Sequence, residues 1–162
     1  MRTAIVSTYP PRACGIGAFA ADVRSALLGL DGIDRVEKVI VVNEPSRPQR
    51  PGLTATIAQA VRGDYARAAR ILGRLDVDVV MLQHEYGIFG GRDGDYVVSL
   101  VEQLSQPLVV TLHTVLSEST PHQADVLAAV CRQAQLVRRT SRNVKQSNTA
   151  SPVRWRADGP VP

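Results

Sequence analysis

The sequence predicts an α/β fold in which helices cover an open, parallel β-sheet. Four short segments are nearly continuous runs of β-branched and other apolar residues, which is typical of strands that are buried on both faces. The segments between them carry apolar residues at helical spacing, as expected for helices that pack on a sheet. With 162 residues, the chain is long enough for one domain with a substantial core.

The first half of the chain contains two of the predicted strands. The segment TAIVSTY (3–9) is predicted as a strand, a loop follows over 10–14, and a helix begins near Gly15. The apolar residues at helical spacing there are Ile16, Phe19, Ala20, Val23, Leu27 and Leu30. A second strand is predicted over 36–43 (VEKVIVVN). The segment 44–53 contains three prolines and is predicted to be an exposed loop.

The second half of the chain repeats the alternation. A helix is predicted from Asp64, a strand over 77–83 (VDVVMLQ), a glycine-rich loop over 87–94 with a helix after it, and a fourth strand over 107–113 (PLVVTLH). Thr120-Pro121 predicts the start of a last helix, because threonine caps a helix and proline fits its first position. The apolar faces of these three helices contain Tyr65, Ala68, Ala69, Leu72, Val97, Leu100, Val101, Leu104, Leu127, Val130, Cys131 and Ala134.

The apolar pattern stops at Arg138. Residues 138–162 contain six basic residues and one acid, and no Leu, Ile, Phe or Met, so this segment is predicted to be a disordered tail. The tail contributes +5 to the formal net charge of +4, which leaves −1 for the predicted domain over 1–137. A nucleic-acid-binding module would carry basic charge on its folded part, so binding to nucleic acid is not predicted.

The compartment follows from the cysteines and from the hydropathy. Cys14 and Cys131 are the two cysteines, and they lie far apart without CxxC spacing, which fits a protein of the reducing cytoplasm. No apolar run approaches the roughly 18 residues that a transmembrane helix needs. We therefore expect a cytoplasmic protein without a transmembrane segment.

Polar and glycine residues cluster where three of the predicted strands end. Because ligands of open parallel sheets bind beyond the carboxyl ends of the strands, these loops are expected to converge on one crevice. The glycines Gly15 and Gly17 at a helix start suit an anion, since helix N-terminal amides donate hydrogen bonds there, although a simple tight turn explains them equally well. The other residues predicted in the crevice are His84, Glu85, Gly90, Gly91 and His113.

Two other site chemistries are disfavoured by the pattern. The glycine loop departs from the dinucleotide fingerprint, because Ala20 occupies its last glycine position and Asn43, not an acid, ends the second strand. An NAD-dependent oxidoreductase is therefore the third hypothesis. His84, Glu85 and His113 lack the HExxH spacing and are a poor ligand set, so no metal is predicted. His113 is compatible with a ligand contact or with a core position, and His84 with a loop hydrogen-bond network.

Three motifs in order resemble a known family. They are TAIVSTYPPRACGIGAFAADV (3–23), QHEYGIFGGRDGDYV (83–97) and VVTLHTVL (109–116). Together they resemble the N-terminal domain of bacterial GT-B glycosyltransferases of the family 4 type, over roughly residues 2–137. The resemblance implies two Rossmann-like domains that face a cleft. It also implies retaining transfer of a hexose from a nucleotide-sugar, as co-substrate, to a sugar or lipid-linked acceptor.

The resemblance also implies roles for the crevice residues. Gly15 and Gly17 would approach the donor diphosphate, and His113 would contact the transferred sugar near the reacting carbon. The loop that carries His84, Glu85, Gly90 and Gly91 would border the acceptor. No metal or other cofactor is implied, and a lipid-linked acceptor would bring the protein to the membrane surface as a peripheral protein.

The resemblance ends abruptly inside an element. The family would continue after Leu136-Val137 with an apolar strand and then with the domain that binds the nucleotide, whereas this chain continues RRTSRNVKQSNTASPVRWRADGPVP. We therefore expect a truncated or frameshifted chain without the donor-binding domain, inactive alone and with an unpaired sheet edge. The alternatives are a genuine short form, namely a non-catalytic sugar- or phosphate-binding module, or a subunit that pairs with a separate donor-binding chain.

Overall fold

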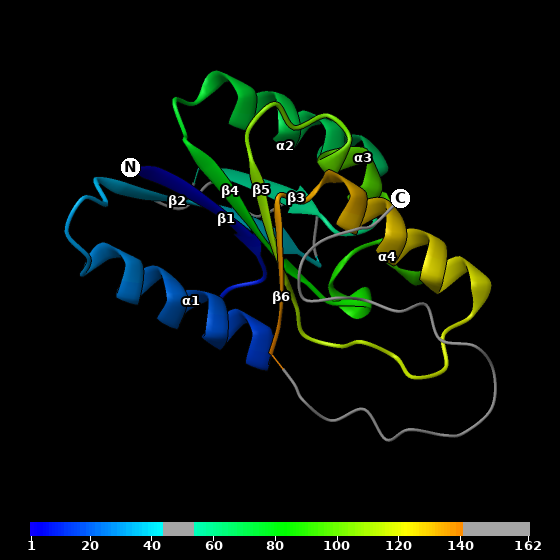
Figure 1. Cartoon of the computed structure of the whole chain (residues 1–162). Coiled ribbons are helices and arrows are strands. Elements are labelled where there is room, and N and C mark those ends of the chain that lie inside the picture. The colour runs from blue at the N-terminus through cyan, green and yellow to red at the C-terminus, as the bar shows by residue number, and fades with distance from the viewer. Residues whose placement is uncertain (44–53, 141–162) are drawn as a thin grey trace.

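The computed structural model describes residues 1–43 and 54–140. Its centre is one sheet of six parallel strands in the order β3-β2-β1-β4-β5-β6 (Figure 1). The predicted open parallel sheet with flanking helices is thereby confirmed. The loop predicted over 44–53 and residues 141–162 of the predicted tail lie outside the described residues.

The elements follow one another in a regular alternation. The strands are β1 (Arg2–Ser7), β2 (Arg35–Val42), β3 (Ala55–Ala58), β4 (Val79–His84), β5 (Leu108–Leu112) and β6 (Leu136–Arg139). The helices are α1 (Gly15–Leu28), α2 (Arg62–Arg74), α3 (Tyr96–Val101) and α4 (Pro121–Gln133). Two short 3₁₀ turns, η1 (Tyr86–Ile88) and η2 (Arg92–Gly94), shape the loop after β4.

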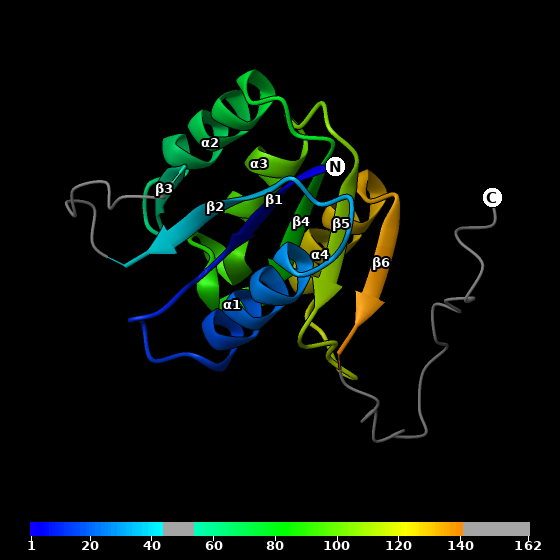
Figure 2. The ribbon, with the colours of Figure 1, turned by 90° about the vertical axis from the view of Figure 1, so that its left-hand side faces the viewer.

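The helices divide unequally between the two faces of the sheet. Helix α1 lies on one face, while α2, α3 and α4 lie on the other (Figures 1 and 2). The larger core fills the face of the three helices, and a smaller cluster around Ile5 and Ala20 fills the face of α1. Within α2, the four predicted core residues are all buried, because its apolar residues recur on one face.

Helix α4 begins where the sequence predicted. The Thr120 hydroxyl accepts a hydrogen bond from the Gln123 amide at 3.2 Å, and the Gln123 side chain accepts one from the Thr120 amide at 2.9 Å. This reciprocal capping box satisfies two amides at the helix start. Pro121 occupies the first helical position, where a missing N–H is harmless.

Two strands correct the predicted element order. Strand β3 is missing from the prediction, since ATIA is short and follows the proline-rich segment. Strand β6 continues past Val137 through Arg138 and Arg139, and the Thr140 amide donates to the carbonyl of Leu112 at 3.0 Å. The expectation that the sheet lacks this strand was therefore wrong, because backbone pairing with β5 holds residues whose side chains are polar.

The apolar periodicity predicted more buried residues in and just after α1 than the structure contains. Phe19 is 37% exposed and Leu30 is 58% exposed, although both were predicted on the apolar face. Helix α1 contacts β1 and β2 rather than the whole sheet, so part of its surface has no strand beneath it. The Phe19 ring is consequently available to the loops at the end of the sheet.

The strand order indicates where a ligand would bind in a sheet of this type. Strand β1 lies between β2 and β4, so successive connections depart from it in opposite directions. In doubly wound sheets, ligands bind beyond the carboxyl ends of the strands at such a reversal point. Here the loops after β1 and β4 flank that point. Within residues 1–43 and 54–140, no helix combines the length and the apolar character that crossing a membrane requires.

Candidate functional site

The loop between β1 and α1 lies at the carboxyl end of β1, where the sequence analysis predicted a crevice. Its first residue, Thr8, is buried, and its hydroxyl lies 3.3 Å from the Cys14 sulfur. A turn in which the Arg12 amide donates to the Tyr9 carbonyl at 3.1 Å brings the chain to the start of α1. Cys14 is the residue before the helix, and its side chain does not cap the helix by a hydrogen bond. Helix α1 therefore begins without a side-chain cap.

The two glycines of this loop have different surroundings. A Cβ atom on Gly15 would meet nothing within 4 Å, so this helix start is open to a ligand. Gly17 is buried, and a Cβ atom there would lie 3.3 Å from the backbone of Tyr9. For Gly17, the structure therefore provides a packing reason: helix α1 approaches the preceding loop at this residue.

This difference gives a prediction for alanine substitutions. Gly17→Ala should lower the free energy of unfolding by about 1 kcal/mol, because the Tyr9 backbone must move away from the new methyl group. Gly15→Ala should change it by less than about 0.5 kcal/mol, because the space there is open. Urea unfolding of both variants measures the difference, and equal effects would contradict the assignment.

Cys14 lies in surroundings that favour its thiolate. Burial acts to raise the pKa of the Cys14 thiol, but the hydrogen bond with Thr8, the amides of Gly17 and Ile16 and the charge of Arg12 together hold it below its ordinary value. Thiols beside a helix N-terminus commonly behave in this way. The side chain that contacts the Cys14 sulfur is the Thr8 hydroxyl, which is not a general base.

His113 directly follows β5 and is partly buried at the carboxyl end of the sheet. Its Nε2 atom lies 2.9 Å from Oε1 of Gln83, a fully buried residue of β4. The Phe19 ring of α1 packs edge-on against the imidazole, with ring centroids 5.0 Å apart. Burial lowers the pKa of His113, although Glu85 acts in the opposite direction. The imidazole is therefore neutral at pH 7.

Glu85 joins the loop after β4 to the loop after β5. Its carboxylate accepts a hydrogen bond from the Tyr86 amide at 3.0 Å and another from the Thr114 hydroxyl. The first contact caps the η1 turn. Glu85 thus lies beside His113, as predicted, but its oxygens are engaged in holding the two loops together.

His84 points away from His113, into the larger core. It is fully buried, with its ring centroid 5.2 Å from that of Tyr86 and 6.0 Å from that of Phe89. Burial and the nearby His113 lower the pKa of His84 to about 4. Neither ring nitrogen has a hydrogen-bond partner among the described residues. In this conformation the aromatic rings of Tyr86 and Phe89, not the crevice, surround the imidazole.

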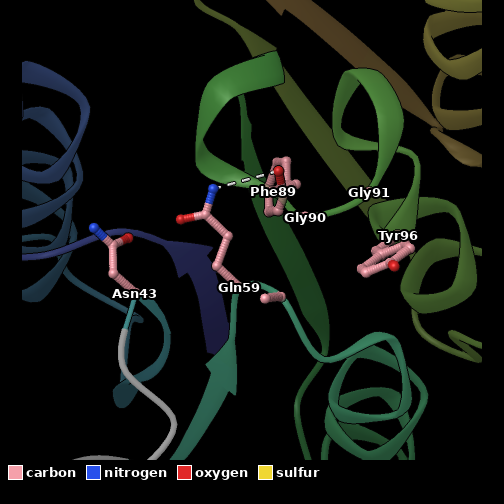
Figure 3. Close-up of a pocket in the computed structure, with 7 residues that line it drawn as sticks. Asn43, Gln59, Phe89, Gly90, Gly91 and Tyr96 are labelled. Atoms are coloured by element: carbon pink, nitrogen blue, oxygen red, sulfur yellow. Dashed lines mark hydrogen bonds between the residues drawn. The ribbon is translucent and has the colours of Figure 1, made fainter.

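Gly90 and Gly91 line a separate hollow of about 310 Å³ at the ends of β2 and β3 (Figure 3). The other lining residues are Asn43, Gln59, Ala60, Phe89 and Tyr96. A Cβ atom on Gly90 would overlap the carbonyl oxygen of Gln59, and Gly91 has a φ of 82°. These glycines are needed for close approach and for a left-handed backbone, respectively.

The glycine-rich loop is held firmly against α2 and β3. The Gly90 amide donates to the Tyr65 hydroxyl at 2.8 Å, and that hydroxyl donates to the Gln59 carbonyl at 3.0 Å. The Gln59 side-chain amide also donates to the carbonyl of Phe89 (Figure 3) and to the carbonyl of Gly87. Arg12 reaches from the first loop to Gln59 Oε1 at 3.3 Å. The loops after β1, β3 and β4 therefore form one connected surface.

The Tyr65 hydroxyl provides a test of this connection. Tyr65→Phe should lower the free energy of unfolding by about 1–3 kcal/mol, because it leaves the Gly90 amide and the Gln59 carbonyl without their partner. Tyr96→Phe is the matched control, since the ring of Tyr96 is only partly buried. Thermal or urea unfolding measures both, and an equal loss in the two variants would refute the role of the Tyr65 hydroxyl.

Three side chains of the site were missed by the sequence analysis. Arg12 and Gln59 link the loops, and Gln83 holds His113. Arg12 carried a signal, because a basic residue just before a glycine-bearing helix start suits an anion. His122 of α4 is partly buried, and its Nδ1 atom lies 2.8 Å from the Asp93 carboxylate. In residues 1–43 and 54–140, no three His, Cys, Asp or Glu side chains are grouped so that they could hold a metal ion.

Comparison with known proteins identifies two solved structures with a similar fold. No protein-family model and no curated protein matches the chain. A solved structure described as "alpha-glucosyltransferase in complex with UDP and a 13-mer DNA containing a central A:G mismatch" is 14% identical, with a TM-score of 0.58 over 86% of this chain and 37% of that one. A second, "alpha-glucosyltransferase (AGT) in complex with UDP", is 14% identical, with a TM-score of 0.54 over 83% and 34%.

These similarities establish the fold. The Rossmann-like sheet of this chain matches part of two glucosyltransferase structures. The chain spans about a third of the length of either structure. At this level of identity, fold does not imply function, so the activity must be argued from the site.

Proposed function

We propose that this chain provides the acceptor-side domain of a retaining, nucleotide-sugar-dependent glycosyltransferase of GT-B fold and family 4 type, acting on a hexose. Two lines of support converge: the resemblance of the three motifs and the fold that this chain shares with two glucosyltransferase structures. The acceptor is a sugar or a lipid-linked sugar. As in the family that the motifs resemble, no metal takes part, and the nucleotide-sugar is a co-substrate.

The contact between α1 and His113 carries the proposal. Phe19 lies in the first turns of α1, and its ring packs on the imidazole of His113. The open helix start at Gly15 and the histidine after β5 thereby adjoin one crevice. In a nucleotide-sugar the sugar is attached directly to the diphosphate. A diphosphate at the helix start would therefore place the sugar beside His113.

The chemistry of the crevice suits departure of a nucleoside diphosphate. Leaving-group charge would be stabilised by amide donors at the helix N-terminus and by the guanidinium of Arg12, whose charge acts on Cys14 at the start of α1. His113 is neutral, since burial lowers its pKa, so it would bind sugar hydroxyls through hydrogen bonds rather than neutralise charge. The loop of Glu85, Gly90 and Gly91 would border the acceptor, while His84 would support it from the core.

The resemblance assigns the nucleotide and the donor sugar mainly to a second domain. We therefore propose that residues 1–162 alone bind ligands weakly and do not catalyse transfer. A second candidate is a non-catalytic sugar- or phosphate-binding module. It is favoured by one observation: the Glu85 carboxylate is tied to Tyr86 and Thr114 rather than free to act as a base.

Titration of the isotope-labelled chain with UDP-glucose tests the proposal. The NMR signals of Gly15 and His113 should shift together, and His113→Ala should weaken this binding about tenfold because it removes the hydrogen bonds of the imidazole. His122→Ala is the control, since that side chain pairs with Asp93 away from Gly15.

Each other outcome has a defined meaning. No shift with any nucleotide-sugar or sugar would refute the glycosyltransferase proposal. Shifts with inorganic phosphate but not with sugars would favour the binding module, and shifts with NAD alone would favour an oxidoreductase. Sugar transfer by the purified chain would refute the proposed inactivity.

A further inference from the structure

The environment of His113 gives a role to Gln83, a residue without a place in the proposed mechanism. Gln83 belongs to β4 and pairs in register with Thr111 of β5, so the two side chains share one face of the sheet. His113 follows two positions after Thr111 and returns to that face. The pairing continues beyond β5, since the His113 amide donates to the His84 carbonyl at 3.0 Å. Both backbones are therefore fixed.

Gln83 is placed to act on one ring nitrogen of His113. Its side chain is fully buried, and Oε1 lies 2.9 Å from His113 Nε2. In this orientation of the Gln83 amide the oxygen accepts, so the imidazole donates through Nε2, and the buried Nε2 of Gln83 has no partner among the described residues. The Phe19 ring packs edge-on against the imidazole of His113 and restricts the rotation of the imidazole. Two other titratable groups lie near His113. Glu85 acts to raise the pKa of His113, and His84 has a pKa that His113 helps to lower.

We propose that Gln83 is a positioning residue that holds the proton of neutral His113 on Nε2, so that Nδ1 is presented to the crevice as a hydrogen-bond acceptor. This inference rests on the proposed function for the identity of the ligand. A bare nitrogen accepts hydrogen bonds from hydroxyl groups and repels the oxygens of a phosphate, which are acceptors too. Gln83 thereby makes His113 selective for the sugar hydroxyls of a nucleotide-sugar rather than for its diphosphate.

The tautomer of His113 can be measured directly in the ligand-free chain. Long-range ¹H–¹⁵N correlation spectra distinguish a protonated from a bare ring nitrogen, and the His113 signals are identified by their loss in His113→Asn. At pH 7 the wild-type chain should show protonated Nε2 and bare Nδ1. Protonated Nδ1 would overturn the proposal without any Gln83 variant.

Two variants separate positioning from packing. Gln83→Leu should remove the tautomer preference, so that the two ring nitrogens give averaged signals. Gln83→Glu should keep the proton on Nε2 and shift the His113 titration upward, because a carboxylate stabilises the imidazolium. The control is Gln106→Leu, which removes a different glutamine that donates to the Leu72 carbonyl. An unchanged tautomer in a folded Gln83→Leu chain would overturn the proposal.

A ligand titration then tests selectivity. Gln83→Leu should weaken the affinity for UDP-glucose by the same factor as His113→Ala does. The affinity of both variants for inorganic pyrophosphate should equal that of the wild type. Weakened pyrophosphate binding in Gln83→Leu would count against selective recognition of hydroxyls. Because the tautomer is measured without a ligand, its outcome is independent of the UDP-glucose titration that tests the proposed function.

Discussion

Acidification from pH 7 to about pH 4 is expected to remove about 3 kcal/mol from the free energy of unfolding through one residue, His84. His84 is fully buried, and burial, with the nearby His113, lowers its pKa from 6.5 to about 4. In the unfolded chain the residue regains the pKa of 6.5. Between these two values the unfolded state binds a proton that the folded state does not.

The sign of the effect follows from proton linkage. Stability falls wherever acid adds protons to the unfolded state alone, so the loss begins near pH 6.5 and is complete below about pH 4. Above pH 6.5 His84 is neutral in both states and contributes no pH dependence. His113, whose pKa is lowered mainly by burial, acts in the same direction.

Urea unfolding at a series of pH values measures this effect. The variant His84→Leu cannot bind a proton, so its stability should depend much less on pH between 7 and 4. His122→Asn serves as the control, because it removes a histidine that is only partly buried. If His84→Leu keeps the full wild-type slope, the acid sensitivity does not come from His84.

Gly90→Ala is the substitution with the other large expected effect. The new methyl group would overlap the Gln59 carbonyl and would come within 2.9 Å of the Tyr96 ring. A backbone carbonyl cannot move aside as a flexible side chain can, so we expect a loss of about 3 kcal/mol in the free energy of unfolding. The substitution also disturbs the amide that donates to Tyr65.

Gly87→Ala is a matched control in the same loop. Nothing lies within 4 Å of its Cβ position, and the residue is exposed. Its stability should stay within about 0.5 kcal/mol of the wild type. Urea unfolding of the pair gives the comparison, and a Gly90→Ala variant as stable as Gly87→Ala would show that the Gln59 carbonyl can shift.

Apolar periodicity predicted most of the fold, because most of its helices and strands bury apolar residues in a regular pattern. Strands β1, β2, β4 and β5 are apolar runs, and each appears close to its predicted bounds. Strand β3 is only four residues long, too short for periodicity to distinguish from a loop. Strand β6 was not predicted because it contains Arg138 and Arg139. All four of its residues are exposed, and backbone hydrogen bonds to β5 maintain it.

The edge of the sheet at which these loops lie was predictable, but their contacts were not. Strand ends and the reversal point in strand order explain why the loops of Gly15, Glu85 and His113 lie at the same edge of the sheet. Adjacent residues of a strand face opposite sides of a sheet, but the sequence could not show that Gln83 faces His113 and that His84 faces Tyr86 and Phe89. Nor could it distinguish the open Gly15 from the packed Gly17, because only the approach of Tyr9 separates them.

The anchoring of the loop after β4 has a consequence for motion. Its Gly90 amide is bonded to Tyr65 of α2, and its Asp93 carboxylate is bonded to His122 of α4. Local opening of this loop would therefore break contacts to two helices at once, so its amide protons exchange with water only in larger, cooperative openings. Despite its glycines, we therefore expect this loop to move less than a glycine-rich loop without such contacts, and we expect ligand binding to rearrange other segments first.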